Sequence, residues 1–377
     1  VCPMSFSEND KIWMQRALNL ARKGEGYVSP NPMVGCVIVS KSGDVIGEGF
    51  HERYGKPHAE HNALQSVENE SALEDSTVYV TLEPCSHHGK TPPCCEMIAD
   101  LPVKRVVTAM KDPNPNVDGK GLKYLKKKGI QVDTGLLKKE AEKLNEFYLH
   151  FTEFGLPFVT LKIAQTADGY IAAPNGDSRW ITGHESRTRV HQWRSRYDAV
   201  LVGRNTVDLD NPSLTVRHAE GRQPHRIVID GPFELSRDLN LFSDQYEEKT
   251  MIITHNRDRA ATDADPMLKI MKPNYFRGRV ILVPEKDGHS DLRAALKALG
   301  KEGITSVLVE GGQILSTAML KEGLVDKLEL FMAPKILGGG TRSILGLGIN
   351  RMEEIITFKS IDWTRVGEDM LLTAYLS

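Results

Sequence analysis

In the first 150 residues, segments whose apolar positions have the spacing of a helix alternate with extended apolar segments typical of strands. Residues 8–23 have helical spacing, which glycines and prolines interrupt from residue 24 onward. Residues 33–39 and 45–49 are extended runs joined by a turn-rich Lys-Ser-Gly-Asp segment, so they predict a hairpin. The same reasoning predicts helices at 58–67, from Cys94, at 121–128 and at 138–147, and strands at 77–82, 103–110 and 130–134. This alternation is typical of a sheet with parallel strands and right-handed crossovers.

The pattern restarts around residues 151–157, whose sequence Phe-Thr-Glu-Phe-Gly-Leu-Pro marks a short domain boundary. We therefore expect two domains, at residues 1–152 and 153–377. The second half predicts another α/β domain with strands at 158–163, 199–202, 226–229, 251–254, 280–283, 306–309 and 327–332, and helices near 185–196, 291–300 and 313–321.

Composition narrows the classes of function. The 377 residues are 40% hydrophobic, which is ample for a buried core in each domain. A formal net charge of −2 provides no general attraction to nucleic acid, and a small-molecule substrate is favoured. The odd count of five cysteines indicates a reducing compartment, and no early apolar run is long enough for a signal peptide or membrane span. We expect a cytoplasmic protein without a membrane partner.

Two short motifs supply the ligands of a catalytic zinc site. His58-Ala59-Glu60 offers an imidazole, and Cys85 and Cys94 offer two thiolates. Three such ligands leave tetrahedral zinc one open position for water, whose pKa the metal lowers toward ~7. His-x-Glu followed by Pro-Cys is typical of zinc-dependent base deaminases, although eight residues separate these cysteines where the nucleic-acid editors have two.

Glu60 remains free for proton transfer, because it is not needed as a ligand. It would take a proton from the attacking water, deliver it to a ring nitrogen and then protonate the departing amine. The alternative for this residue is a solvated helix glutamate.

Alternatives to this ligand set also exist in the sequence. Cys85 and Cys94 can be read as ordinary buried cysteines and His58 as a core histidine. His87 and His88 are rival ligands, but histidines in a loop rich in glycine and proline more often contact substrate or solvent. Cys95 and Cys36 are expected in the core, since Cys95 points about 100° away from Cys94 on a helix.

A wider set of motifs resembles the bifunctional deaminase-reductase of riboflavin biosynthesis. Beyond the zinc motifs, the segments that carry this resemblance are Ser29–Gly35, Asp112–Pro115, Val159–Lys162, Asp168-Gly169, Trp180–Thr182, Asp210–Pro212, Val309–Gly312 and Ala333–Lys335. They cover nearly the whole chain in the order that the family shows. The resemblance implies an α/β fold class, with an N-terminal cytidine-deaminase-like three-layer domain and a C-terminal domain like dihydrofolate reductase.

The resemblance also implies roles for individual residues. Zinc is assigned to His58, Cys85 and Cys94, and the deaminase substrate to Asn31, His51, Lys90 and Asn114. NADPH is assigned to Ala164, Trp180, Thr206, Asp210, Gly312, Gln313, Ile314, Leu315, Ser316, Thr317 and Ala318. The reductase substrate is assigned to Lys162, Ser178, Arg194, Leu214, Arg217 and Glu310. Thr166-Ala167 replaces the family's usual Ser-Leu before Asp168-Gly169.

The chemistry of several residues agrees with these roles. Lys90 suits a phosphate as a point charge, while Arg194 and Arg217 suit a 5-phosphate through planar donation. Asn31 and Asn114 can also be plain turn residues beside proline. Residues 307–313 form an apolar strand that passes through two glycines into a helix start, which presents amides to a phosphate or is simply a turn. Lys162 lies in an apolar run, where a charge requires a partner.

We therefore predict a two-step enzyme. The first domain would remove the 2-amino group of 2,5-diamino-6-(5-phosphoribosylamino)pyrimidin-4-one, and the second would reduce the ribosyl chain to ribityl with NADPH. Lys162 or Asp210 would organise proton transfer in the reduction. The alternatives are a nucleic-acid base deaminase with an accessory domain, and a second domain that only binds ligand or builds an oligomer. We expect one zinc per chain, a small phosphoribosylaminopyrimidine substrate, and a homo-oligomer, either a dimer or a tetramer.

Overall fold

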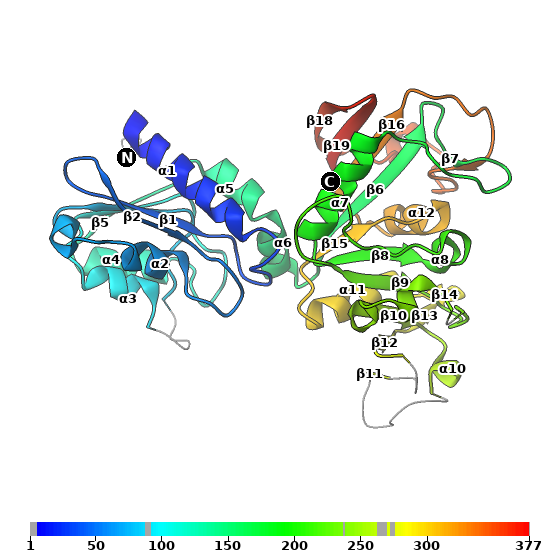
Figure 1. Ribbon diagram of the computed structural model, residues 1–377, viewed down its shortest axis with the longest axis horizontal. Helices are drawn as coiled ribbons and strands as arrows, with labels where there is room; N and C mark the ends of the chain where they lie inside the picture. The colour runs from blue at the N-terminus through cyan, green and yellow to red at the C-terminus, as the bar shows by residue number, and fades with distance from the viewer. Residues whose placement is uncertain (1–5, 87–91, 237, 262–269, 272–275, 377) are drawn as a thin grey trace. The chain divides into compact units, whose positions relative to one another are not determined.

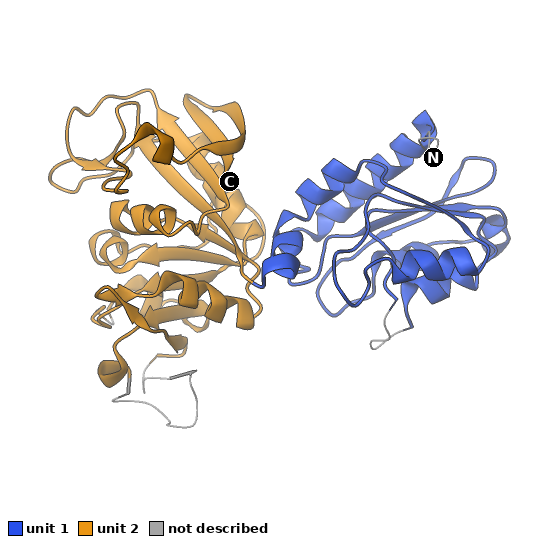
Figure 2. Cartoon of the chain, turned by 180° about the vertical axis from the view of Figure 1, so that it is seen from behind, with its two compact units in different colours: residues 1–155 blue, residues 156–377 orange. Residues whose placement is uncertain are grey.

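The computed structural model describes residues 6–86, 92–236, 238–261, 270–271 and 276–376. The chain divides into two compact units, residues 1–155 and 156–377, coloured separately in Figure 2. Each unit contains its own sheet and its own hydrophobic core. The two are therefore described separately.

The first unit is built on a five-stranded sheet with the order β2-β1-β3-β4-β5. Its strands are β1 (Gly35–Val39), β2 (Val45–Phe50), β3 (Thr77–Val80), β4 (Arg105–Thr108) and β5 (Gln131–Thr134). Its helices are α1 (Glu8–Ala21), α2 (Ala59–Gln65), α3 (Cys94–Ala99), α4 (Lys120–Lys127), α5 (Lys138–Leu144) and α6 (Glu146–Phe154), with 3-10 turns η1 (Arg22–Gly24) and η2 (Glu70–Leu73). Strands β3, β4 and β5 are parallel, as predicted, and β1 is antiparallel to both of its neighbours.

Helices cover both faces of this sheet because its central strands are apolar on both sides. Along β1, Cys36 and Ile38 pack with residues of α2, α3 and α4, whereas Val37 and Val39 pack with α1 and α5. Figure 1 shows α1 and α5 on one face and α2, α3 and α4 on the other. The predicted three-layer α/β architecture is confirmed.

The second unit contains a ten-stranded sheet with the order β11-β12-β10-β9-β8-β15-β6-β16-β19-β18. Its strands are β6 (Phe158–Thr166), β8 (Ala199–Gly203), β9 (His225–Ile229), β10 (Thr250–Thr254), β11 (Ile270–Met271), β12 (Arg279–Leu282), β15 (Ser306–Val309), β16 (Lys327–Ala333), β18 (Phe358–Val366) and β19 (Asp369–Leu376). Four short strands form two separate ladders: β7 (Tyr170–Ala172) with β17 (Thr341–Arg342), and β13 (Glu285–Lys286) with β14 (His289–Ser290).

Helices connect the strands of the second sheet. They are α7 (His184–Arg196), α8 (Arg204–Asp210), α9 (Asn240–Ser243), α10 (Arg257–Ala261), α11 (Leu292–Lys301) and α12 (Gln313–Lys321), with 3-10 turns η3 (Glu247–Lys249) and η4 (Met352–Glu354). From β12 to β16 the neighbouring strands are parallel, and their carboxyl ends therefore lie along one edge of the sheet. A large apolar cluster of β6, β8, β15, α11 and α12 stabilises this arrangement.

Two sequence-based expectations about elements were wrong. The helix predicted at 138–147 ends at Leu144, and a separate helix, α6, follows over the segment that we expected to begin the domain boundary. The break occurs because the buried Asn145 amide is hydrogen-bonded to the backbone of Met33, accepting from its N–H at 2.8 Å and donating to its carbonyl at 3.0 Å. The C-terminal hairpin β18–β19 was not predicted at all.

The described part of the chain has no helix that combines the length and the apolar character needed to traverse a bilayer.

Candidate functional sites

The three predicted metal ligands lie together in the first unit. His58 precedes α2 as its N-cap residue, Cys85 lies on the loop after β3, and Cys94 is the first residue of α3. His58 Nδ1 is 3.6 Å from Cys85 Sγ and 3.4 Å from Cys94 Sγ, and the donor atoms of all three residues lie within 4.8 Å of one another. In the described part of the chain this is the one such cluster of three metal-binding side chains.

The electrostatics of the two thiols fit a cation between them. The hydrogen bond from Cys94 lowers the pKa of Cys85 to about 4, and the same bond together with burial raises the pKa of Cys94. The thiolate of Cys85 in turn raises the pKa of His58. The two shifts are opposite in direction, so the pair favours a thiolate on Cys85, and a divalent cation would favour thiolates on both residues and a neutral imidazole. One nitrogen and two sulfurs are a donor set that fits zinc.

Glu60 is buried beside these ligands, with an exposed fraction of 4%. Burial, reinforced by the Cys85 thiolate, raises the pKa of Glu60 to about 7. A carboxyl group with such a pKa accepts and releases protons near neutrality, which is the property of a general acid–base catalyst. The geometry therefore brings together the metal ligands and the carboxylate that the sequence singled out.

Asn31 and His51, predicted to contact substrate, lie side by side near the metal ligands. The ring of His51 is 5.5 Å from that of His58, and His51 Nδ1 is 3.0 Å from the Pro57 carbonyl. Because a carbonyl only accepts, Nδ1 carries the proton and Nε2 accepts from the Asn31 amide at 3.2 Å. Burial lowers the pKa of His51, which keeps the ring neutral.

Asn114 lies on a loop that a buried carboxylate holds in place. The two oxygens of Glu83 accept hydrogen bonds from the backbone amides of Asp112, Gly119, Gly121 and Leu122, at 2.9–3.3 Å. The Asp112 side chain in turn accepts from the backbone N–H of Asn114 at 2.9 Å and from the Tyr148 hydroxyl at 2.9 Å. Glu83 was not singled out from the sequence, although it stands only two residues before Cys85. Lys90, His87 and His88 lie outside the described residues.

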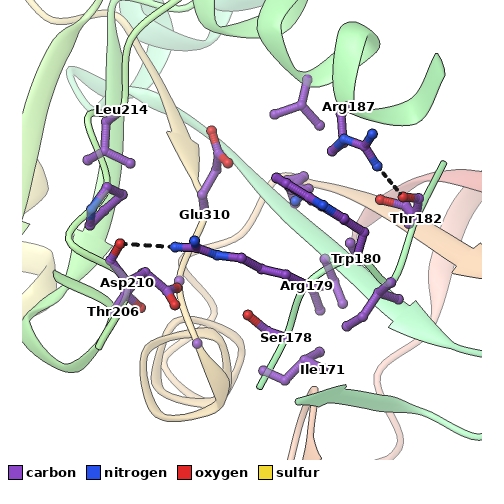
Figure 3. Close-up of a pocket in the computed structure, with 18 of the residues that line it drawn as sticks. Ile171, Ser178, Arg179, Trp180, Thr182, Arg187, Thr206, Asp210, Leu214 and Glu310 are labelled. Atoms are coloured by element: carbon purple, nitrogen blue, oxygen red, sulfur yellow. Dashed lines mark hydrogen bonds between the residues drawn. The ribbon is translucent and has the colours of Figure 1, made fainter. Parts of the chain in front are cut away.

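The second unit contains a pocket of about 660 Å³ at the carboxyl ends of its parallel strands. Residues after β15, on β6 and on α8 line it, as Figure 3 shows for Glu310, Thr206 and Asp210. Open α/β sheets bind ligands at this edge, because helix starts and loops converge there. This volume lies within the range of pockets that bind small organic ligands and cofactors.

Three half-buried charged side chains, Lys162, Arg194 and Glu310, form one wall of this pocket. Arg194 Nε and Nη2 donate to the two oxygens of Glu310 at 2.6 and 2.9 Å, and Arg194 Nη1 donates to the Thr215 carbonyl at 3.0 Å. Burial lowers the pKa of the neighbouring Lys162, while the Glu310 carboxylate opposes that shift. Arg194 is thus engaged within the protein, and a phosphate would have to compete with Glu310 for it. The Arg217 side chain is the more exposed cation of the pocket.

The other predicted reductase residues divide into two groups. Those that line the pocket are Lys162, Ala164, Ser178, Trp180, Arg194, Thr206, Asp210, Leu214, Arg217, Glu310, Gly312 and Ser316. Gln313, Ile314, Leu315, Thr317 and Ala318 lie on α12, outside the lining. Leu315 packs in the hydrophobic core, while Ser316 lines the pocket and the first-turn backbone amides of α12 are free to bind a ligand.

Trp180 lines the pocket, and two cationic side chains, Arg187 and Lys335, fix the position of residues 180–182. The ring is 65% exposed, and the Arg187 guanidinium stacks over it at 4.4 Å from the ring centre. Lys335 donates to the carbonyls of Trp180 and Ile181 at 2.8 and 2.7 Å, and Arg187 donates to that of Thr182. Figure 3 shows Arg187 and Trp180 on the same wall. The exposed indole is therefore an ordered platform for a flat ligand.

Sequence reasoning missed Arg187 and His191 on this wall. Both line the pocket, and His191 Nδ1 accepts the backbone N–H of Arg217 at 3.2 Å. Burial, with the nearby arginines, lowers the pKa of His191 to about 4, so it remains a neutral acceptor. A signal was present: Arg187, His191 and Arg194 recur at i, i+4 and i+7, which places them on one face of a helix.

Two protein families match the chain. Residues 7–110 match the cytidine and deoxycytidylate deaminase zinc-binding region, and residues 157–372 match the RibD C-terminal domain. The first match contains His58, Glu60, Cys85 and Cys94, and the second contains every residue that lines the pocket.

Whole relatives give the same result. The chain is 40% identical to the riboflavin biosynthesis protein RibD of Escherichia coli strain K12 over 377 residues, covering 96% of this chain and 98% of that protein. It is 41% identical to the RibD protein of Aquifex aeolicus strain VF5 over 366 residues, covering 97% and 98%. Among solved structures, form 1 of Acinetobacter baumannii RibD is 37% identical with a TM-score of 0.85, covering 98% of this chain and 99% of that one.

A solved structure from Thermotoga maritima is 34% identical with a TM-score of 0.83, again covering 98% and 99% of the two chains. That protein is described as a diaminohydroxyphosphoribosylaminopyrimidine deaminase and 5-amino-6-(5-phosphoribosylamino)uracil reductase.

Proposed function

The chain belongs to the RibD family of bifunctional deaminase–reductases of riboflavin biosynthesis, and from this premise we propose how its two units divide the work. Residues 1–152 would deaminate 2,5-diamino-6-(5-phosphoribosylamino)pyrimidin-4-one by hydrolysis. Residues 153–377 would then reduce the ribosyl chain of the product to ribityl with NADPH. The enzyme thus takes a small-molecule substrate.

In the first unit, His58, Cys85 and Cys94 would hold one zinc ion. When bound, zinc supplies an activated water for attack on the amino-bearing ring carbon. Glu60 would take one proton from the attacking water and place it on the adjacent ring nitrogen. It would then take the second proton of the same oxygen, as the ring carbonyl forms, and give it to the nitrogen that departs as ammonia. Its pKa of about 7 suits both directions of transfer.

Substrate would be oriented by polar groups around the ligands. Asn31 and His51 form one hydrogen-bonded pair beside His58, and Asn114 lies on the loop that Glu83 anchors. Because the Asn31 amide already donates to His51, its carbonyl oxygen is available to accept from a substrate amino group. Lys90 would contribute a cation for the phosphate.

In the second unit, NADPH supplies the hydride when it is bound. The free backbone amides at the start of the predicted segment Gly312–Ala318, together with Ala164, Trp180, Thr206 and Asp210, would bind the cofactor. Arg217 would bind the substrate phosphate, while Arg194 holds Glu310 ionised and oriented toward the ribose. Ser178 and Leu214 complete the substrate contacts. Lys162 would donate to a ribose oxygen, with Asp210 as the other group able to organise that proton transfer.

Three further properties belong to the proposal. We place the protein in the cytoplasm, which agrees with the free thiols of Cys36, Cys85, Cys94 and Cys95. We propose a homo-oligomer, a dimer or a tetramer, which light scattering would test. We also propose that nucleic acid is not a substrate, in keeping with the net charge of −2.

The observation that carries this proposal is the convergence of His58, Cys85 and Cys94 beside buried Glu60, in a chain that also contains the second pocket. An anaerobic assay with the pyrimidine substrate would follow ammonia release and NADPH loss together. We expect one ammonia and one NADPH per substrate. Ammonia without NADPH loss would reduce the second unit to a binding role, and NADPH loss without ammonia would refute the deaminase assignment.

A further inference from the structure

The loop of residues 211–217 forms a wall of the pocket in a strained backbone conformation. Asn211 has φ +40° and Leu214 has φ +52°, both in the left-handed region that favours glycine. Leu214 and Arg217, proposed above to contact substrate, belong to this loop, and Asp210 immediately precedes it. A left-handed leucine persists only where its surroundings hold it.

Hydrogen bonds from several parts of the second unit hold the backbone of this loop. Asn240 donates from its backbone to Asn211 Oδ1 and from its side chain to the Asn211 carbonyl, both at 2.8 Å. The Gln223 amide accepts from the Val216 N–H at 2.7 Å and donates to its carbonyl at 3.0 Å. The carbonyls on either side of Leu214 are each held by an arginine: Thr215 by Arg194 and Ser213 by Arg226.

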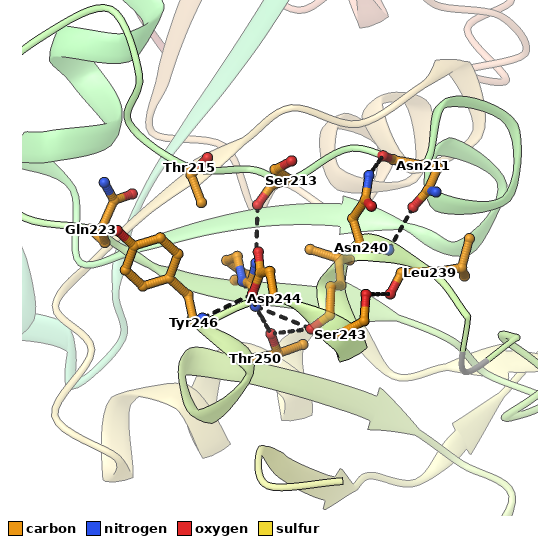
Figure 4. Close-up of polar contacts among 12 residues, drawn as sticks. Asn211, Ser213, Thr215, Gln223, Leu239, Asn240, Ser243, Asp244, Tyr246 and Thr250 are labelled. Carbon is orange, nitrogen blue, oxygen red and sulfur yellow. Dashed lines mark hydrogen bonds and ion pairs between the residues drawn. The ribbon is translucent and has the colours of Figure 1, made fainter.

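Arg226 differs from Arg194 because it does not reach the pocket. Its side chain is 1% exposed, it lies on β9, and it is not among the residues that line the pocket. The guanidinium forms a bidentate pair with Asp244 and donates to Thr250 Oγ1, to the Leu241 carbonyl at 3.1 Å and to the Ser213 carbonyl at 3.2 Å. Figure 4 shows Ser213, Asp244 and Thr250 converging on this point.

A buried guanidinium is retained only when all its donors find partners, since an unsatisfied one is strongly destabilising. The next positions of the same strand, Ile227 and Val228, are buried and apolar. An apolar side chain at position 226 would be buried without needing any hydrogen-bond partner. Among the hydrogen-bond partners of Arg226, Ser213 is the residue that also lines the pocket.

We propose that Arg226 is a positioning residue of the reductase site. By holding the Ser213 carbonyl from the core, it sets the left-handed turn at Leu214 and so the direction in which Arg217 leaves the loop. The functional part of this inference rests on the proposed reductase activity, whereas the structural part concerns the loop alone. Arg226 therefore acts on substrate affinity without touching substrate.

Arg226→Lys is the test variant. Lysine keeps the ion pair with Asp244 but has a single nitrogen, so it cannot span Thr250, Leu241 and Ser213 together. We expect the KM for the deaminated pyrimidine to rise about tenfold, with kcat within about twofold of the parent, because a hydrogen bond to a charged group is lost. Deamination in the first unit serves as the internal standard of protein concentration.

Arg259→Lys is the matched control. It removes another guanidinium of the same unit that pairs with a carboxylate, Glu234, and neither residue lines the pocket. We expect its KM to equal that of the parent. If Arg226→Lys leaves KM unchanged and only lowers kcat in proportion to the amount of folded unit, measured by NADPH titration, Arg226 is merely structural and the inference is overturned.

Hydrogen exchange gives a readout that needs no activity. The Val216 and Arg217 amides should exchange at least about tenfold faster in Arg226→Lys, while those of β8 stay protected. A parent without reductase activity would refute the proposed function and leave this readout to decide the inference. If Arg226→Lys fails to fold, Asp244→Asn keeps the guanidinium but weakens the ion pair that orients it, and an unchanged KM and exchange rate there would overturn the proposal.

Discussion

The two candidate sites differ in how they manage charge. The metal centre concentrates three candidate ligand side chains within 4.8 Å, with two thiols and one imidazole facing the same point. The pocket of the second unit spreads its charges over a volume of about 660 Å³ and pairs some of them within the protein, as in the Arg194–Glu310 pair. The first site gathers its charged groups around the place of one metal ion, whereas the second pairs Arg194 internally and leaves Arg217 for a ligand.

This difference determines what substitution should do at each site. At the metal centre, no neighbouring side chain can replace a metal ligand or Glu60, so we expect a substitution there to reduce the rate of deamination sharply. In the pocket, other polar groups of the same network remain after a substitution, so we expect either kcat or KM of the reduction to change and the other to change little.

Glu60→Gln should give the largest effect. The amide has nearly the same shape but cannot exchange protons, so ammonia release should fall by ~10²–10⁴-fold or more. Zinc, measured by metal analysis, should stay at one per chain, whereas the Cys85→Ser, Cys94→Ser double variant should lose it.

The exposed Glu70→Gln is the control for that substitution, with parental activity expected. A Glu60→Gln protein that deaminates within a few-fold of the parent would remove Glu60 from the mechanism. Full zinc occupancy in the double cysteine variant would defeat the ligand assignment.

Lys162→Met should abolish reduction and spare deamination. The methylene stem can still pack, but no donor remains for the ribose oxygens, and we expect NADPH oxidation to fall by at least about 10²-fold. NADPH affinity, measured by fluorescence titration, should change little. Lys321→Met, an exposed lysine of α12, is the matched control. A parental rate in Lys162→Met would transfer the proton-transfer role to Asp210.

Glu83→Gln should have the smallest effect of this series. The amide nitrogen cannot accept, so some of the backbone N–H groups that Glu83 serves lose their partner, at a cost of about 1–3 kcal/mol in unfolding free energy. Because these groups anchor the Asn114 loop, deaminase KM should rise, and thermal unfolding of the first unit should occur earlier. The exposed Glu74→Gln should behave as the parent. Equal stability and KM in both variants would show that the Asn114 loop does not depend on Glu83.

Sequence alone indicated the cluster of candidate metal ligands more completely than the contacts of the pocket, for a physical reason. His58 and Glu60 are two residues apart, Cys85 follows a predicted strand and Cys94 opens a predicted helix, so short-range spacing carries the information. The contacts of the pocket join residues far apart in the chain, such as Lys335 with Trp180 and His191 with Arg217. No local pattern encodes which side chain of a helix meets which loop.

The missed elements have similar causes. Asn145 breaks a helix because its side chain pairs with Met33, more than one hundred residues away in sequence. Strand β18 is exposed along eight of its nine residues, so it lacks the buried alternation that identifies a strand. Most other strands, being buried and apolar, were predicted within a few residues of their observed ends.

We propose that two independent sites of this chain act one after the other on the same substrate. The most direct test mixes equal amounts of Glu60→Gln and Lys162→Met proteins with the pyrimidine substrate and NADPH. Each variant alone should fail to complete both steps, and the mixture should release ammonia and consume NADPH in equal amounts. If the mixture consumes no NADPH although Glu60→Gln alone reduces added deaminated intermediate, the intermediate does not pass between chains. If Glu60→Gln cannot reduce that intermediate at all, the two activities share one site, which would contradict two independent sites.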